Sequence, residues 1–341
     1  MSFNWCFIGC GKLANTVAKQ MAKHGGHKIV SCYTRDYEKC CQFGKAWSAT
    51  AYASAKDAIL AEGVDAVYVV TPHNAHHRFT KLALELEKPV LCEKAFTVTA
   101  AETEELIALA KEKNLYLCEA MWTWFSPAAN RVKRWVDSGE VGKVSGADFT
   151  YHMMSVNYAP RNSDPRRAGG ALLNITVYPI AYAYRLFGYP TSIESHGTIV
   201  NEIDHGEEIK MTFKGGEVVN ISASMVDTKG LEKMTIYGDK GMIKAPLYHA
   251  CGIATLYKKP LSIKPFLSGG KIFNSYMDEF DKVADEIRRG LTESEVYPLK
   301  STLDIMKIMD EIRGQIGLVY DNLEYFSWRH CHSAAFLRPK N

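Results

Sequence analysis

Short apolar runs alternate with amphipathic stretches through the first 120 residues. The β-rich runs cover residues 6–8, 28–33, 66–70, 90–92 and 116–118. One intervening stretch begins with a capping box, Thr99 and Glu102, and then carries Leu106, Ile107 and Ala110 at helical spacing. Strands that alternate with helices predict a parallel sheet with crossover helices, and therefore an α/β fold.

The pattern changes after Trp122. Ser126 and Pro127 begin a predicted helix, and extended segments dominate from Lys143 onward. Glycine-containing turns at 214–217 and 238–241 predict antiparallel hairpins, and further helices are expected near 170–187, 275–289 and 301–320. We therefore predict a domain at 1–121, an α+β domain with an open, mainly antiparallel sheet at 122–325, and an unassigned tail at 326–341.

Composition excludes several classes of protein. The chain has 341 residues, 47% hydrophobic and 23% charged, which is ordinary for a soluble globular protein of about two domains. Its net charge of +3 is small and dispersed, so nucleic acid is not an expected partner. The chain begins directly with a strand-like run and has no apolar run of about 18 residues, so we expect a cytoplasmic protein without a membrane span.

The nine cysteines are consistent with the expected cytoplasmic location. They are odd in number and scattered, and several lie in apolar strands, where a free thiol behaves as a small hydrophobic group. Cys40 and Cys41 are adjacent but lack a Cys-x-x-Cys spacing, so we expect neither a disulfide nor a redox motif there.

A glycine-rich segment follows the first predicted strand directly and opens a helical stretch. This context is typical of the phosphate-binding turn of a Rossmann domain. Gly9 permits the tight turn, Gly11 lets the backbone approach a pyrophosphate, and the helix start offers unpaired N–H groups. The candidate cofactor residues in this segment are Gly9, Cys10, Gly11, Lys12 and Leu13.

The end of the second strand indicates which dinucleotide binds. NAD sites commonly place an acid there for the ribose hydroxyls, whereas NADP sites often supply arginine. Thr34 and Arg35 could hold a 2′-phosphate, which favours NADP. Asp36 keeps NAD possible, because a shift of one residue would make it the ribose acceptor.

Polar residues also follow the next two inner strands. Thr71, Pro72, Asn74 and His76 are candidate cofactor contacts after the run that ends at residue 70. The three histidines of this segment lack a cysteine or carboxylate at a suitable spacing, so no metal site is assigned. Glu93 and Lys94 close the run at 90–92, and a lysine at this edge rarely serves packing.

These motifs together resemble the family of glucose–fructose oxidoreductase, inositol dehydrogenase and MocA proteins. The resemblance rests on the segments 9–11, 71–76, 93–94 and 169–178 and covers nearly all of the chain up to about residue 325. The stretch 119–122 and the tyrosine at 178 look most like the dimeric trans-1,2-dihydrobenzene-1,2-diol dehydrogenase subgroup, whose members also act on aldoses such as xylose with NADP.

The resemblance implies hydride transfer between nicotinamide and a carbinol or carbonyl carbon of a sugar, polyol or dihydrodiol. It implies Lys94 and Tyr178 as catalytic residues, with Asn174 and Trp122 at the substrate. We expect the Lys94 ammonium to lower the pKa of the Tyr178 phenol toward 7. The chain departs from the family pattern at Ala95, where proline is usual, at Asn174, where an acid is usual, and at Trp124, where the subgroup tends to have arginine.

Two other functions stay open at this point. Some members of such a family cleave glycosidic bonds through transient oxidation by tightly held NAD, and others are non-catalytic dinucleotide or sugar sensors. The predicted second sheet has one face that no other predicted element covers, so a homodimer or higher homo-oligomer is expected.

Overall fold

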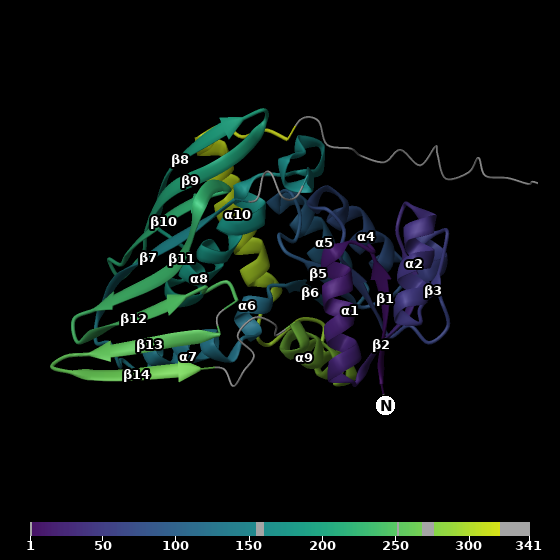
Figure 1. Ribbon diagram of the computed structural model, residues 1–341, viewed down its shortest axis with the longest axis horizontal. Helices are drawn as coiled ribbons and strands as arrows, with labels where there is room; N and C mark the ends of the chain where they lie inside the picture. The colour runs from purple at the N-terminus through teal and green to yellow at the C-terminus, as the bar shows by residue number, and fades with distance from the viewer. Residues whose placement is uncertain (1, 155–159, 251, 268–275, 321–341) are drawn as a thin grey trace, which may run out of the picture.

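The computed structural model describes residues 2–154, 160–250, 252–267 and 276–320. Two sheets lie side by side with helices between them (Figure 1). The predicted tail at 326–341 and the predicted helix start at Ser275 lie outside the described residues.

The first sheet has six parallel strands. They are β1 (Phe3–Ile8), β2 (His27–Tyr33), β3 (Thr50–Ala51), β4 (Ala66–Val69), β5 (Val90–Glu93) and β6 (Leu117–Ala120). Their order is β3-β2-β1-β4-β5-β6, so the direction of strand addition reverses between β1 and β4. In such sheets the crevice outside the carboxyl ends at the reversal is the usual ligand site. The predicted parallel sheet is confirmed, and only the two-residue β3 was not foreseen.

Helices cover both faces of this sheet. They are α1 (Lys12–His24), α2 (Tyr37–Trp47), α3 (Ala55–Ile59), α4 (His76–Glu85) and α5 (Ala100–Glu112), with the short turn η1 (His73–Ala75) before α4. The predicted capping box at α5 is present, since the Thr99 hydroxyl accepts from the Glu102 N–H at 3.2 Å. The Glu102 carboxylate accepts from the Val98 N–H at 3.0 Å, one residue earlier than the usual box.

The second sheet has eight strands. They are β7 (Val144–Met154), β8 (Ser192–Val200), β9 (Ile203–Thr212), β10 (Val218–Ser224), β11 (Val226–Gly238), β12 (Gly241–Pro246), β13 (Ile253–Lys258) and β14 (Ser262–Leu267). Their order is β14-β13-β12-β11-β7-β10-β9-β8, and every pair is antiparallel except β7 with β10. Both predicted hairpin turns join neighbouring strands, β9 to β10 and β11 to β12. The predicted α+β architecture is confirmed.

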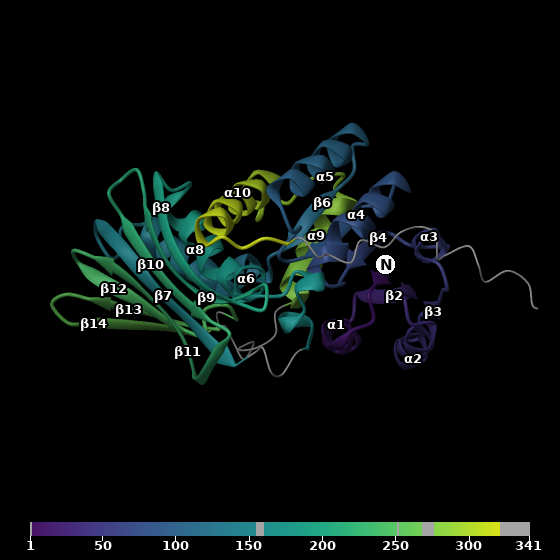
Figure 2. The ribbon, with the colours of Figure 1, turned by 90° about the horizontal axis from the view of Figure 1, so that it is seen from above.

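The remaining helices link the two sheets. They are α6 (Trp122–Phe125), α7 (Pro127–Asp137), α8 (Val177–Phe187), α9 (Tyr276–Arg288) and α10 (Leu299–Ile316), with short turns η2 (Pro160–Ser163) and η3 (Pro165–Arg167) and a π-helical turn η4 (Leu172–Thr176) that leads into α8. Figure 2 shows α6, α8 and α10 on the side of the second sheet that faces the first. The predicted helix at 301–320 is corrected at both ends. It begins directly after Pro298, and Gly317 ends it in a left-handed conformation.

Helix α9 returns to the first sheet, which the sequence pattern did not predict. The Phe280 ring meets Trp5 edge-on at 4.8 Å and Tyr68 at 5.0 Å, measured between ring centroids. These rings are buried, so α9 completes the core on that side of the first sheet.

The described residues contain no helix that combines the length and the apolar character needed to cross a membrane. Their seven cysteines are all free thiols.

Candidate active site

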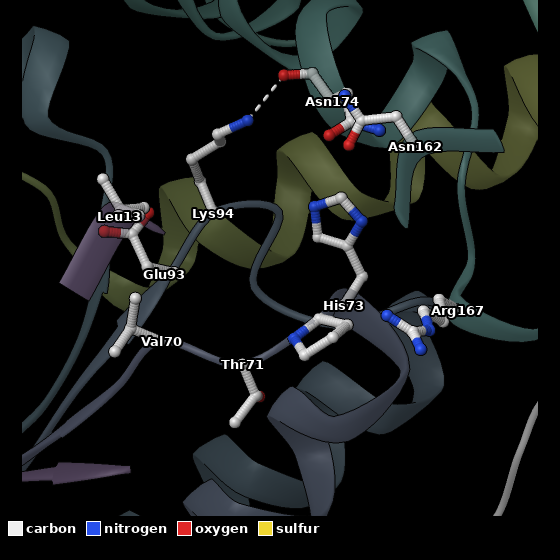
Figure 3. A pocket seen from close by; sticks show the side chains of 10 residues that line it. Leu13, Val70, Thr71, His73, Glu93, Lys94, Asn162, Arg167 and Asn174 are labelled. Atoms are coloured by element: carbon white, nitrogen blue, oxygen red, sulfur yellow. Dashed lines mark hydrogen bonds between the residues drawn. The ribbon is translucent and has the colours of Figure 1, made fainter. Parts of the chain in front are cut away.

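A pocket lies at the carboxyl ends of β4 and β5, at the reversal point of the first sheet. Its near side is formed by Leu13 of α1, by residues 70–73 after β4, and by Glu93 and Lys94. Its far side is formed by Asn162, Arg167 and Asn174, which precede α8 (Figure 3). The pocket thus joins the two halves of the chain, and Lys94 points across it.

The glycine-rich loop has the geometry of a phosphate cradle. Gly9 has a φ of +114°, and a Cβ there would stand 2.5 Å from the carbonyl oxygen of Val70, so only glycine fits. A Cβ on Gly11 would meet nothing within 4 Å in the described residues. Gly11 is the N-cap of α1 and, being glycine, makes no side-chain cap hydrogen bond to the first N–H groups of α1. This end of the helix fits a dinucleotide pyrophosphate.

Thr71 gives a second sign of a ligand. Its hydroxyl oxygen is buried in the wall of the pocket and has no hydrogen-bond partner within the described parts of the chain. A buried hydroxyl without a partner costs free energy, and a bound polar group would remove that cost.

Asp36 caps helix α2. Its carboxylate accepts from the Lys39 N–H at 3.1 Å and lies 3.5 Å from the Lys39 ammonium. The Lys39 N–H holds the pKa of Asp36 below its usual value. Strand β2 ends at Tyr33, so Thr34 and Arg35 connect β2 to the cap of α2. The Arg35 side chain is exposed.

A π-helical turn orients Lys94. In its i→i+5 pattern the Asn174 carbonyl would accept from residue 179, which is Pro179 and has no N–H. The Lys94 ammonium donates to that carbonyl instead, at 2.5 Å (Figure 3). The Asn174 side-chain amide donates to Gly170 O at 2.7 Å. The peptide bond between Lys94 and Ala95 is cis, although the residue is not the proline that the family pattern would place there.

Tyr178 lies directly behind Lys94. The Lys94 ammonium stands over the face of the Tyr178 ring, 4.7 Å from its centroid. The Tyr178 hydroxyl accepts from the Trp122 indole N–H at 3.1 Å, and the Trp122 ring stacks on Tyr276 at 4.8 Å. The four residues predicted from the family motif to act at the substrate, Lys94, Trp122, Asn174 and Tyr178, therefore form one connected group.

Two buried acids fix the start of the helix that carries Asn174 and Tyr178. Asp204 accepts from the Leu172 N–H, and Glu207 accepts from the Thr176 hydroxyl at 2.6 Å. Gly170 has a φ of +121°, and a Cβ there would stand 1.8 Å from an Asp204 carboxylate oxygen. The glycine is therefore required for the acid to reach the helix end.

Comparison with known sequences identifies the family. Residues 3–120 match the oxidoreductase family with an NAD-binding Rossmann fold, and residues 129–244 match the GFO/IDH/MocA C-terminal domain. The chain belongs to the GFO/IDH/MocA oxidoreductase family. It is therefore an oxidoreductase that uses a nicotinamide dinucleotide, as the sequence motifs predicted.

The chain is also similar over almost its whole length to proteins of known name. D-xylose 1-dehydrogenase (NADP⁺) of Hypocrea jecorina is 29% identical over 94% of this chain and 94% of its own length. Trans-1,2-dihydrobenzene-1,2-diol dehydrogenase of Danio rerio is 29% identical over 94% of this chain and 98% of its own.

Solved structures show the same fold. A 3-ketoreductase of Actinomadura kijaniata, determined with NADP and TDP-benzene, has a TM-score of 0.82 at 19% identity and covers 92% of this chain and 98% of its own. An aldose-aldose oxidoreductase of Caulobacter crescentus has a TM-score of 0.83 at 19% identity, over 93% of this chain and 98% of its own.

Two residues expected at the cofactor have other contacts in this structure. His76 is fully buried, and its ring nitrogens lie 2.9 Å from the carbonyl oxygens of Ala95 and Thr71. Burial lowers the pKa of His76 to about 4. The Asn74 side chain donates to Arg166 O at 3.0 Å. His76 thus supports the loop that carries Lys94, and Asn74 joins the two halves of the chain.

Sequence reasoning missed three residues of the pocket, namely His73, Asn162 and Arg167. His73 lies within the recognised segment 71–76, and its ring is 3.1 Å from the Ala168 carbonyl. Asn162 and Arg167 lie in a connection without hydrophobic periodicity. Only the neighbouring Gly169 and Gly170 gave a signal that the backbone is tightly constrained there.

Burial controls the ionisation of Tyr178. Desolvation is the largest effect and raises the pKa of the phenol well above its ordinary value, and the neighbouring Tyr151 raises it further. The expectation that Lys94 lowers this pKa toward 7 is wrong for this structure, because the ammonium contacts the face of the ring and donates to the Asn174 carbonyl. Tyr178 is therefore a neutral hydrogen-bonding group at neutral pH.

Buried acids lie behind Lys94. Glu93 accepts a hydrogen bond from the Tyr68 hydroxyl. Desolvation raises the pKa of Glu119 to about 7, although Lys94 acts in the opposite direction. Glu279 is fully buried, and desolvation raises its pKa well above the ordinary value, with Glu93 and Glu119 adding to the shift. Glu93, Glu119 and Glu279 thus form a buried acidic layer behind Lys94.

Proposed function

We propose that the chain catalyses NADP-dependent hydride transfer at a carbinol or carbonyl carbon of a sugar, polyol or dihydrodiol. The observation that carries this proposal is the Lys94 ammonium, which is fixed by the Asn174 carbonyl and stands between the glycine-rich cradle and Tyr178. The names of the D-xylose and dihydrodiol dehydrogenases to which it is similar support the substrate class.

The choice of NADP rests on the residues after β2. Asp36 caps α2, and the exposed Arg35 follows the end of β2 beside Thr34, which supports their assignment to a 2′-phosphate. In the wider site we propose that Gly9, Cys10, Gly11, Lys12 and Leu13 hold the pyrophosphate, and that Thr71, Pro72 and Glu93 line the nicotinamide side. A fluorescence titration should give tighter binding of NADPH than of NADH, and Arg35→Glu should reverse that order. Equal affinities in both proteins would refute the assignment.

Each catalytic residue has a distinct role. The dinucleotide, when bound, supplies or accepts the hydride. Lys94 donates to the reacting substrate oxygen and stabilises the negative charge that develops on it. Tyr178 keeps its proton at neutral pH and accepts from Trp122, so its own O–H can donate to the same oxygen; on reduction it gives that oxygen its proton and regains one from solvent, and on oxidation the proton moves the other way. Asn174 positions Lys94 through its carbonyl, and Trp122 shapes the substrate side.

Replacement of Lys94 by methionine tests the proposal. Lys94→Met removes the ammonium and keeps a similar side-chain length, so kcat/KM should fall by about 10²- to 10³-fold. NADPH affinity should change little. Lys111→Met, at an exposed position of α5, is the matched control and should keep full activity. Full turnover in Lys94→Met would refute the assignment of Lys94.

A panel of sugars, polyols and diols distinguishes the proposed reaction from its alternatives. Net formation or loss of NADPH absorbance with a panel member supports the dehydrogenase or reductase. Glycoside cleavage without added dinucleotide would instead indicate a redox-neutral glycosidase, and ligand binding without turnover would indicate a sensor. The described site contains no feature that favours either alternative over hydride transfer.

We further propose that the protein is a cytoplasmic homodimer with domains at 1–121 and 122–325. Figure 2 shows no helix of the described residues on the outer face of the second sheet. That face is polar, since Asp148 accepts from Asn220 at 2.9 Å and from Tyr237 at 2.8 Å. A second copy could therefore pair there through hydrogen bonds. Sedimentation should give a dimer at micromolar concentration, and a monomer would refute the pairing.

A further inference from the structure

Three thiols from separate elements meet beneath the glycine-rich loop. Cys10 lies between Gly9 and Gly11, Cys32 lies in β2 and Cys40 lies in the first turns of α2. Their three sulfur atoms all lie within 4.8 Å of one another, and the Cys32 and Cys40 sulfurs are 3.6 Å apart. Cys32 and Cys40 are fully buried and Cys10 is partly exposed, so the cluster is reached from the side of the loop.

The spacing matches a three-thiolate metal site. Thiolate sulfurs bind zinc-like ions at about 2.3 Å, so three sulfurs around one ion stand about 4 Å apart. Soft ligands of this kind select soft d¹⁰ cations over magnesium or calcium. We propose that Cys10, Cys32 and Cys40 bind one soft thiophilic cation, such as Cd²⁺ or Zn²⁺, and that its binding opposes that of the dinucleotide.

The proposed coordination changes the charge beneath the phosphate cradle. Each thiol loses a proton to solvent as its sulfur bonds to the ion, so three neutral thiols and one divalent ion become a group of net charge −1. Cys10 is part of the loop that would hold the anionic pyrophosphate. The negative charge of the metal–thiolate group would repel the pyrophosphate. NADPH affinity should therefore fall by roughly tenfold or more when the ion is bound. By linkage, NADPH should weaken ion binding by the same factor.

The other cluster of metal-binding side chains in the described residues behaves differently. His24 and His27 both lie 2.9 Å from the Asp281 carboxylate. The Trp5 indole N–H donates to Nδ1 of His27, which leaves the proton of that ring on Nε2, facing the acid. Those groups already satisfy one another, and they contain no sulfur. They therefore cannot produce a thiolate signal in a titration.

Titration of the reduced full-length protein with Cd²⁺ tests the proposal. Wild type should show ultraviolet charge-transfer absorption of thiolate bound to cadmium, saturating at one ion per chain. Cys32→Ser and Cys40→Ser should each lose most of this signal, while Cys41→Ser should keep it. Cys41 is adjacent to Cys40 but exposed, which makes it the matched control. An equal signal in all four proteins, or the loss of the signal in Cys41→Ser, would overturn the site.

A second titration tests the opposition between the ion and the dinucleotide. NADPH affinity of the wild type should fall on saturation with Cd²⁺, whereas that of Cys40→Ser should be insensitive to it. Unchanged NADPH affinity in the cadmium-saturated wild type would overturn the coupling. Only this second part rests on the proposed function, because the charge-transfer signal is measured without dinucleotide. Thermal unfolding of each variant shows that a lost signal comes from the missing sulfur and not from a loss of fold.

Discussion

The two walls of the pocket are built on different principles. On the cofactor side, Gly9 and the start of α1 act through backbone geometry, and Gly9 lies against the Val70 carbonyl at the end of β4. On the far side, the helix with Asn174 and Tyr178 is held by Asp204 and Glu207, which lie about thirty residues later in β9. The first wall depends on backbone conformation, and the second depends on contacts between buried polar side chains and a helix end.

This difference bears on how each wall tolerates change. A cradle built from backbone fails when that backbone cannot adopt the required conformation. A wall held by buried acids depends on charge state and on exact partners, because an unpaired buried polar group costs about 1–3 kcal/mol. Substitutions on the two sides should therefore give separable effects on cofactor binding, turnover and stability.

The largest effect is expected from Gly9→Ala. Its Cβ would stand 2.5 Å from the Val70 carbonyl oxygen at a φ of +114°, so the loop must move. We expect kcat/KM to fall by about 10³-fold, with a loss of about 3 kcal/mol in the free energy of unfolding. NADPH fluorescence and urea unfolding measure the two effects.

Gly11→Ala sharpens the same test. A Cβ at this position meets no atom within 4 Å in the described residues, so the fold should keep its stability. The methyl group would still occupy the space into which the pyrophosphate fits, so NADPH binding should weaken. If Gly9→Ala and Gly11→Ala lost the same stability, the cradle would not have the geometry described above.

Tyr178→Phe tests the far wall of the pocket. The change removes the hydroxyl that accepts from Trp122 and that we assign to the substrate oxygen, so kcat should fall by about 10²- to 10³-fold. Dinucleotide affinity should stay near that of the wild type. Tyr182→Phe is the matched control, because this tyrosine lies one turn later in α8 and donates to Tyr248 O at 3.2 Å. Equal turnover in both variants would remove Tyr178 from the reaction.

The two walls also differ in how far the sequence could predict them. Gly9, Gly11 and the capping box of α5 could be read because each motif lies within a few consecutive residues, whereas the close approach of Gly9 to the Val70 carbonyl could not. The family motif identified Lys94 and Tyr178 but not how they contact each other. The position of Lys94 depends on a contact with a residue 80 positions away, and the neutral phenol depends on burial. The cysteine cluster was missed for the same reason, since Cys10, Cys32 and Cys40 follow no motif spacing.

Glu119→Gln tests the charge state of the acidic layer. Burial raises the pKa of Glu119 from an ordinary 4.5 to about 7, so the folded chain keeps a proton that the unfolded chain has lost. Glu119 therefore costs the wild type no free energy of unfolding below about pH 4.5. As the pH rises from 4.5 toward 7, the free energy of unfolding falls. The variant lacks this loss and should be more stable than the wild type by about 3 kcal/mol at pH 8, with little difference at pH 4.5.

Urea unfolding at both pH values measures this difference. The glutamine oxygen can still accept from the Phe96 N–H, which donates to Glu119 at 3.1 Å. Glu62→Gln, at an exposed position, is the control and should follow the wild-type pH profile. A Glu119→Gln profile parallel to that of the wild type would mean that Glu119 ionises normally in the folded chain.

The smallest effect is expected from Pro179→Ala. Alanine restores an N–H that can bond the Asn174 carbonyl, which now accepts from Lys94 at 2.5 Å. The ammonium would lose its fixed partner, and kcat should fall by about tenfold while NADPH affinity stays constant. Pro127→Ala, in the first turn of α7, is the control because no helix bond is missing there.

This pair of variants decides whether Pro179 fixes Lys94 by leaving the Asn174 carbonyl free of a helix hydrogen bond. A helix without an internal proline is intrinsically more stable, so Pro179→Ala should unfold at the same or a higher urea concentration than the wild type. Lower turnover together with equal or greater stability would show that the missing N–H serves Lys94 and not the fold. Unchanged turnover would mean that Lys94 holds its position without the Asn174 carbonyl, and the two walls would then be less different than their contacts indicate.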